Sequence, residues 1–116
     1  MPPRLWRFRI EDMLNALAGI AEDVDGLSYD DFVSDRKTRN SVARELEIIG
    51  EAARHIPVDI EAFYSQIPWR LMRDMRNVIA HEYFGVDWQI VWETAVHDLP
   101  VLRPLLESIL NDGKEY

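Results

Sequence analysis

Residues 68–84 read PWRLMRDMRNVIAHEYF, and the apolar residues of this stretch recur with the period of an α-helix. On a helical wheel drawn at about 100° per residue, the apolar side chains share one arc, which predicts a buried face. That arc consists of Leu71, Met72, Met75, Val78 and Ile79. The polar arc consists of Arg70, Arg73, Arg76, Asn77, Ala80, His81 and Tyr83. With a proline in its first turn and Gly85 after its end, we expect a helix from about Pro68 to Phe84.

The helical period continues on both sides of this stretch. Towards the N-terminus it predicts helices over about 5–24, 29–34 and 36–56, and a short helix or turn over about 59–64. Towards the C-terminus it predicts a last helix over about 88–109. No segment alternates apolar and polar residues as a strand would. The sequence therefore predicts an all-α, up-and-down bundle of about four to five main helices.

Local signals mark the ends of several of these helices. Ser28 has an acidic residue three positions later and so resembles the start of a capping box. Asp35 and Asp87 are expected to cap the helices that follow them. Pro100 and Pro104 each remove a backbone donor from the last helix, so a kink is expected there.

The composition limits the functions that fit. The chain has 116 residues, 13 Lys and Arg against 21 Asp and Glu, a net charge of −8, and no cysteine. This length suits a single domain over residues 1–116, and the lack of cysteine fits the reducing cytoplasm. Because no apolar stretch has the length of a membrane span or the form of a signal peptide, we expect a soluble protein without a membrane partner. So acidic a chain cannot coat nucleic acid by diffuse attraction, and any RNA contact must be local.

The polar arc of the 68–84 helix carries the groups that RNA cleavage without a metal requires. In that reaction a ribose 2′-hydroxyl attacks the adjacent phosphorus. An arginine can hold the phosphoryl oxygens through two hydrogen bonds, and an imidazole can exchange protons at cellular pH. We therefore predict Arg76 and His81 as catalytic residues, supported by Asn77 and Arg73. From the spacing alone, a solvated basic surface is the simpler interpretation.

Two glutamates outside this helix are candidates for supporting the site. Glu47 and Glu51 lie one helical turn apart and could pair with Arg70 or Arg73. A solvated charged edge is an equally good interpretation.

The remaining histidines and tryptophans have ordinary structural explanations. His55 and His97 lack partners at metal-ligand spacing, so we expect neither a metal nor a cofactor. Trp88 and Trp92 fall on the apolar stripe of the last helix and are assigned to the core or to a dimer interface. Trp69 lies near the polar arc and could belong to the core or stack on RNA bases.

An ordered set of motifs resembles the HepT-like branch of the HEPN toxins. Residues 76–83 match the Arg-x-x-x-x-His-x-Tyr motif of that family, with its preferred polar Asn directly after the arginine. The other matching segments are IIGEAA (48–53), HIP (55–57), IPW (67–69), FGVD (84–87), VW (91–92) and DLP (98–100). Together they extend over most of residues 5–110, which makes the resemblance specific. The main departure is Pro104, which is expected to break the last helix later than in the family.

The resemblance implies a helical homodimer whose motif helices meet at a cleft, and an endoribonuclease that needs no metal and forms cyclic phosphate ends. It also implies a type VII-like toxin-antitoxin pair, in which RNA is the substrate and an MNT-type nucleotidyltransferase antitoxin is the partner. In such pairs the antitoxin adenylylates the motif tyrosine, which is Tyr83 here. The alternative is a non-catalytic helical binding or scaffold subunit of a nucleotidyltransferase complex. The intact set of Arg76, His81 and Tyr83 favours the enzyme.

Overall fold

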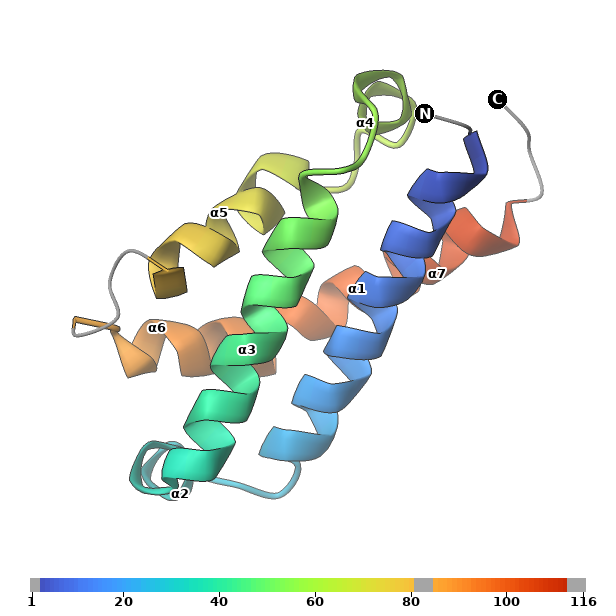
Figure 1. Cartoon of the computed structure of the whole chain (residues 1–116). Helices are drawn as coiled ribbons and strands as arrows, with labels where there is room; N and C mark the ends of the chain where they lie inside the picture. Colours follow the sequence, from blue (N-terminus) through green and yellow to red (C-terminus); the bar gives the residue numbers. More distant parts are fainter. Residues whose placement is uncertain (1–2, 81–84, 113–116) are drawn as a thin grey trace.

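The chain folds into helices only, as far as the structure describes it (Figure 1). The computed structural model describes residues 3–80 and 85–112, and their side chains for residues 5–76 and 85–112. Its helices are α1 (Pro3–Val24), α2 (Tyr29–Ser34), α3 (Arg36–Ala53), α4 (Val58–Phe63), α5 (Trp69–Ala80), α6 (Trp88–Glu93), the π-helical turn η1 (Thr94–Asp98) and α7 (Leu99–Asn111). The predicted all-α architecture is confirmed. None of these helices is both long enough and apolar enough to cross a membrane.

The long helices α1 and α3 form the centre of the molecule. They lie side by side and antiparallel, and the loop between them carries α2 (Figure 1). Helix α5 packs on α3 on the side away from α1, while the run from α6 through η1 to α7 crosses behind both long helices (Figure 1). The helix that carries the predicted catalytic arginine therefore rests directly on α3.

The predicted helix starts are confirmed by their capping hydrogen bonds. The Asp31 backbone N–H donates to Ser28 Oγ at 3.1 Å, and the Ser28 backbone N–H donates to Asp31 Oδ2 at 3.1 Å, which completes the capping box. The carboxylates of Asp35 and Asp87 each accept two backbone N–H groups at the start of α3 and α6. Gly26, with φ of 74°, takes the left-handed turn after α1 that side chains disfavour.

The core joins α1 and α3 to the last helical run. Its fully buried side chains include Trp6, Ile10, Met13, Ile20, Phe32, Val42, Ile49, Met72, Leu106 and Ile109. Trp69 belongs to this core, since it is 5% exposed and its Nε1–H donates to the Tyr64 carbonyl at 3.1 Å. Trp88 and Trp92 are partly buried and pack on Phe32, with ring centroids 6.2 and 5.2 Å away. Trp69 therefore belongs to the core, and Trp88 and Trp92 pack against it.

The two prolines of the last helix act differently. The α-helical pattern is interrupted just before Pro100, where Leu99 N–H donates to the Thr94 carbonyl in a π-helical turn. Such a turn is one of the ways in which a helix accommodates proline. The predicted break at Pro104 is wrong, because α7 continues through it to Asn111. Leu106 and Ile109 beyond it are fully buried, and this packing offsets the lost hydrogen bond.

One prediction for α5 is also wrong. Leu71, placed on the buried arc from the sequence, is 65% exposed, whereas Met72 is 0% and Trp69 5% exposed. Helix α5 is thus rotated about its axis relative to the orientation expected from the sequence. It packs on α3 through the edge of the apolar arc that lies next to Arg76. The predicted end of this helix, beyond Ala80, lies outside the described residues.

Candidate active site

A close approach of two backbones positions Arg76. At Gly50 of α3, an added Cβ atom would lie 2.7 Å from Arg76 Cβ and 2.8 Å from the Arg76 backbone nitrogen. Real Cβ atoms essentially never come so near, so only glycine fits while α5 keeps this distance from α3. This contact explains the rotation of α5, because it draws the Arg76 side of the helix towards α3. In the sequence, Gly50 stands out only as part of the IIGEAA motif (48–53).

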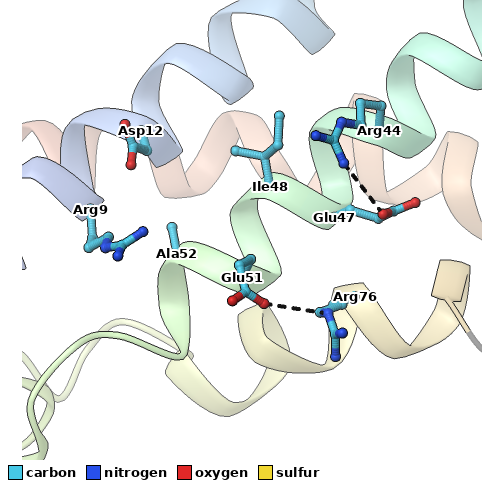
Figure 2. A pocket seen from close by; sticks show the side chains of 8 residues that line it. All are labelled: Arg9, Asp12, Arg44, Glu47, Ile48, Glu51, Ala52 and Arg76. Carbon is cyan, nitrogen blue, oxygen red and sulfur yellow. Dashed lines mark ion pairs between the residues drawn. The ribbon is translucent and has the colours of Figure 1, made fainter.

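Arg76 lines an open pocket of about 270 Å³ between α1, α3 and α5 (Figure 2). The pocket is lined by Arg9, Asp12, Arg44, Glu47, Ile48, Glu51, Ala52 and Arg76. Three guanidinium groups from three different helices thus share one pocket with three carboxylates. Arg9 and Arg44 were not predicted as site residues, because no local pattern links them to Arg76.

The carboxylate of Glu51 is the direct partner of Arg76 (Figure 2). Arg76 Nε lies 3.5 Å from Glu51 Oε2, and Arg54 Nη1 lies 3.2 Å from the same oxygen. The sequence had suggested Arg70 or Arg73 as the partner. The partner differs because Glu51 follows Gly50 directly and so lies at the point where α3 and α5 touch.

The surroundings of Glu51 keep its carboxylate ionised. A hydrogen bond with the His55 ring at 3.3 Å lowers the pKa of Glu51, and the charges of Arg54 and Arg76 lower it further. The side chains of Arg76 and Glu51 are 40% and 46% exposed. Exposed ion pairs of this kind contribute only about 0–1 kcal/mol, so an incoming anion can replace Glu51 as the partner of Arg76.

The other predicted site residues are not all brought to this pocket. Arg73 points towards α4, where its Nη1–H donates to Glu61 Oε2. Glu47 lines the pocket and pairs with Arg44, with Nη1 and Oε2 3.8 Å apart. Asn77 belongs to α5, but its side chain is outside the described part.

The residues that complete the motif lie outside the description. His81 and Tyr83 belong to residues 81–84, which the structure does not describe. In the described residues, no three His, Asp or Glu side chains cluster as metal ligands would.

The family described as Ribonuclease HepT-like matches residues 13–109, and the chain belongs to this family of HEPN ribonucleases. The match covers the part of the pocket that α3 and α5 form and the whole Arg-x-x-x-x-His-x-Tyr motif, whereas Arg9 and Asp12 of α1 lie before it. The resemblance found from the motifs is thereby confirmed.

Curated relatives carry ribonuclease names. "Probable ribonuclease HepT" of Thermococcus cleftensis is 41% identical over 100 residues, which is 86% of this chain and 91% of that protein. A protein of Caldanaerobacter subterraneus subsp. tengcongensis, provisionally named an RNase, is 37% identical over 105 residues, or 90% of this chain and 94% of its own length. A similarly named protein of Methanocaldococcus jannaschii is 33% identical over 112 residues, or 97% of this chain and 93% of its own length. No solved structure matches the chain significantly.

Proposed function

We propose that this protein is a metal-independent endoribonuclease toxin of a type VII-like toxin-antitoxin pair, with Arg76 and His81 as its catalytic residues. The observation that carries the proposal is the family match over residues 13–109, which includes the complete motif from Arg76 to Tyr83. The ribonuclease names of the relatives support it. So does the accessible guanidinium of Arg76, whose exposed partner Glu51 can give way to a phosphate at little cost.

The proposed reaction needs only a base and a group that stabilises negative charge. The ribose 2′-oxygen forms a bond to phosphorus, and the bond from phosphorus to the 5′-oxygen of the next nucleotide breaks. His81 accepts the proton of the attacking hydroxyl, and the resulting imidazolium or a water molecule protonates the leaving oxygen. Arg76 holds the charge that develops on the phosphoryl oxygens, with Asn77 as a supporting residue. Arg73 has no part in this step, because it pairs with Glu61 on α4. The products are a 2′,3′-cyclic phosphate and a 5′-hydroxyl.

Cleavage is expected to persist in EDTA and to leave 2′,3′-cyclic phosphate ends, because the attacking oxygen belongs to the RNA and no bound metal has to activate water. The measurement is digestion of an end-labelled RNA by the purified protein, with and without EDTA, followed by mass spectrometry of the fragments. A strict need for magnesium, or fragments that end in a 5′-phosphate, would contradict this chemistry. Growth arrest on expression of the chain alone is the matching result in cells.

A partner nucleotidyltransferase is expected to transfer AMP to the Tyr83 hydroxyl and to silence the ribonuclease. On the helical wheel Tyr83 lies about 20° from Arg76, so the added phosphate would compete for the same guanidinium. Intact-mass and peptide mass spectrometry after co-expression with the partner measure the modification, and Tyr83→Phe is the control that should resist it. Neutralisation with Tyr83 unmodified would favour the scaffold interpretation, in which the partner acts by binding alone.

The proposed active form is a homodimer, in which two Arg76 surfaces face one RNA. A single small pocket offers few contacts to a chain of phosphates, and a second copy doubles them. Light scattering of the unmodified protein tests this, and a fully active monomer would rule out a shared cleft.

A further inference from the structure

Two arginines outside the family motif line the same pocket as Arg76. Arg9 comes from α1 and Arg44 from α3, while Arg76 comes from α5 (Figure 2). In Figure 2 the Arg9 side chain reaches from α1 towards α3, across the pocket from Arg44. The packing of three helices thus brings together guanidiniums that are far apart in the sequence.

Both guanidiniums are available to a ligand. Arg44 has a side chain that is 71% exposed, and its only ion pair with a residue that the structure describes, Glu47, is long at 3.8 Å. Such exposed pairs are weak and easily exchanged. Arg9 forms no ion pair within 4.0 Å with any residue that the structure describes.

The shape and the lining of the pocket select the kind of ligand. Its volume of about 270 Å³ lies below the range of roughly 300–1,000 Å³ that is typical of pockets enclosing drug-sized molecules. Only Ile48 and Ala52 of the eight lining residues are apolar, and none of the eight is aromatic. A nucleobase therefore has no ring to stack on, whereas a phosphodiester finds arginine forks.

We infer that Arg9 and Arg44 bind phosphates of the RNA strand next to the one held by Arg76, and that they do so without regard to base sequence. This inference rests on the proposed ribonuclease function. The three carboxylates of the pocket, on Asp12, Glu47 and Glu51, balance the three guanidiniums. Each contact is accordingly modest, and affinity comes from several phosphates held together.

The test is the affinity of the full chain for a 2′-O-methyl oligoribonucleotide, which it cannot cleave, measured over a range of salt concentrations. Arg9→Gln and Arg44→Gln are each expected to weaken binding by roughly three- to tenfold at low salt. Each is also expected to reduce the slope of log affinity against log salt by about 0.7, the value for one phosphate contact on a single strand. A second oligonucleotide of unrelated sequence should give the same losses.

Variants of an ion pair on α7 are the control for the change in net charge. Arg103 and Glu107 form an exposed helical ion pair at 4.0 Å, much like Arg44 and Glu47, but neither lines this pocket. Arg103→Gln changes the net charge as Arg44→Gln does and should leave binding within twofold, a limit of about 0.4 kcal/mol. Glu47→Gln frees Arg44 and should strengthen binding, whereas Glu107→Gln should not.

Binding and cleavage, measured together, distinguish a failure of phosphate binding by Arg9 and Arg44 from a failure of the proposed ribonuclease function. If the unmodified protein neither binds the analogue nor cleaves the matching RNA, the proposed ribonuclease function fails and the inference fails with it. If it cleaves RNA while Arg9→Gln and Arg44→Gln bind like Arg103→Gln, with unchanged salt slopes, only the inference is overturned. Losses that depend on the sequence of the oligonucleotide would also overturn it, since they would indicate recognition of bases.

Discussion

Replacing Arg76 or His81 by alanine is expected to lower the rate of RNA cleavage by about a hundred- to thousand-fold, the usual loss when a group that stabilises transition-state charge is removed. Arg76→Ala deletes the hydrogen-bond donors for the phosphoryl oxygens, and His81→Ala deletes the group that exchanges protons. Cleavage rates of a labelled RNA at saturating concentration measure the effect.

A neighbouring arginine provides the matched control. Arg54 contacts the same Glu51 oxygen at 3.2 Å, but it does not line the pocket. Arg54→Ala should therefore keep cleavage within a few-fold of the unmodified rate, about 1 kcal/mol at most. Arg76 is 40% exposed, so its replacement should leave the thermal unfolding temperature nearly unchanged. Full activity in folded Arg76→Ala would exclude this arginine from catalysis.

Gly50→Ala is expected to impair both stability and cleavage, although alanine is the better helix former. The new methyl group would lie 2.7 Å from Arg76 Cβ and 2.8 Å from its backbone nitrogen, and backbone cannot rotate away as a side chain can. Overpacking of this kind typically costs about 1–3 kcal/mol, while the gain in helix propensity is about 1 kcal/mol. The free energy of unfolding, measured in urea, should therefore fall by up to about 2 kcal/mol.

Gly50→Ala should lower the cleavage rate by more than its loss of stability explains. A catalytic group displaced by about 1 Å can lose about a hundredfold in rate, and Gly50→Ala must push Arg76 away from α3. Cleavage is to be compared at a temperature at which both proteins are fully folded.

Gly19→Ala is the control, since its added Cβ meets only the flexible end of Glu45, with Oε2 at 3.2 Å. That variant should be neutral or stabilised by up to about 1 kcal/mol and should cleave normally. Equal behaviour of the two alanine variants would mean that the contact between Gly50 and Arg76 does not position the site.

The sequence was sufficient where the controlling interactions are local. Ser28, Asp35 and Asp87 mark the starts of helices because each caps backbone groups two or three residues away, and these contacts need no other helix. Helical periodicity likewise identified α5 and the polar arc that contains Arg76. The family could be recognised from the sequence as well, because the motif from Arg76 to Tyr83 is one of an ordered set of motifs over most of residues 5–110.

The rotation of α5 and the composition of the pocket were settled by tertiary packing. Periodicity gives the apolar arc of a helix but not which edge of it faces a neighbour. Leu71 was therefore placed inside, and Arg70 or Arg73 was expected as the partner of Glu51. The contact between Gly50 and Arg76 turns α5 and makes Glu51 the partner of Arg76 instead. Arg9 and Arg44 reach the same pocket only because α1, α3 and α5 pack together. Caps and periodicity depend on residues a turn apart, whereas these contacts depend on the distance and rotation between helices, which no local pattern in the chain encodes.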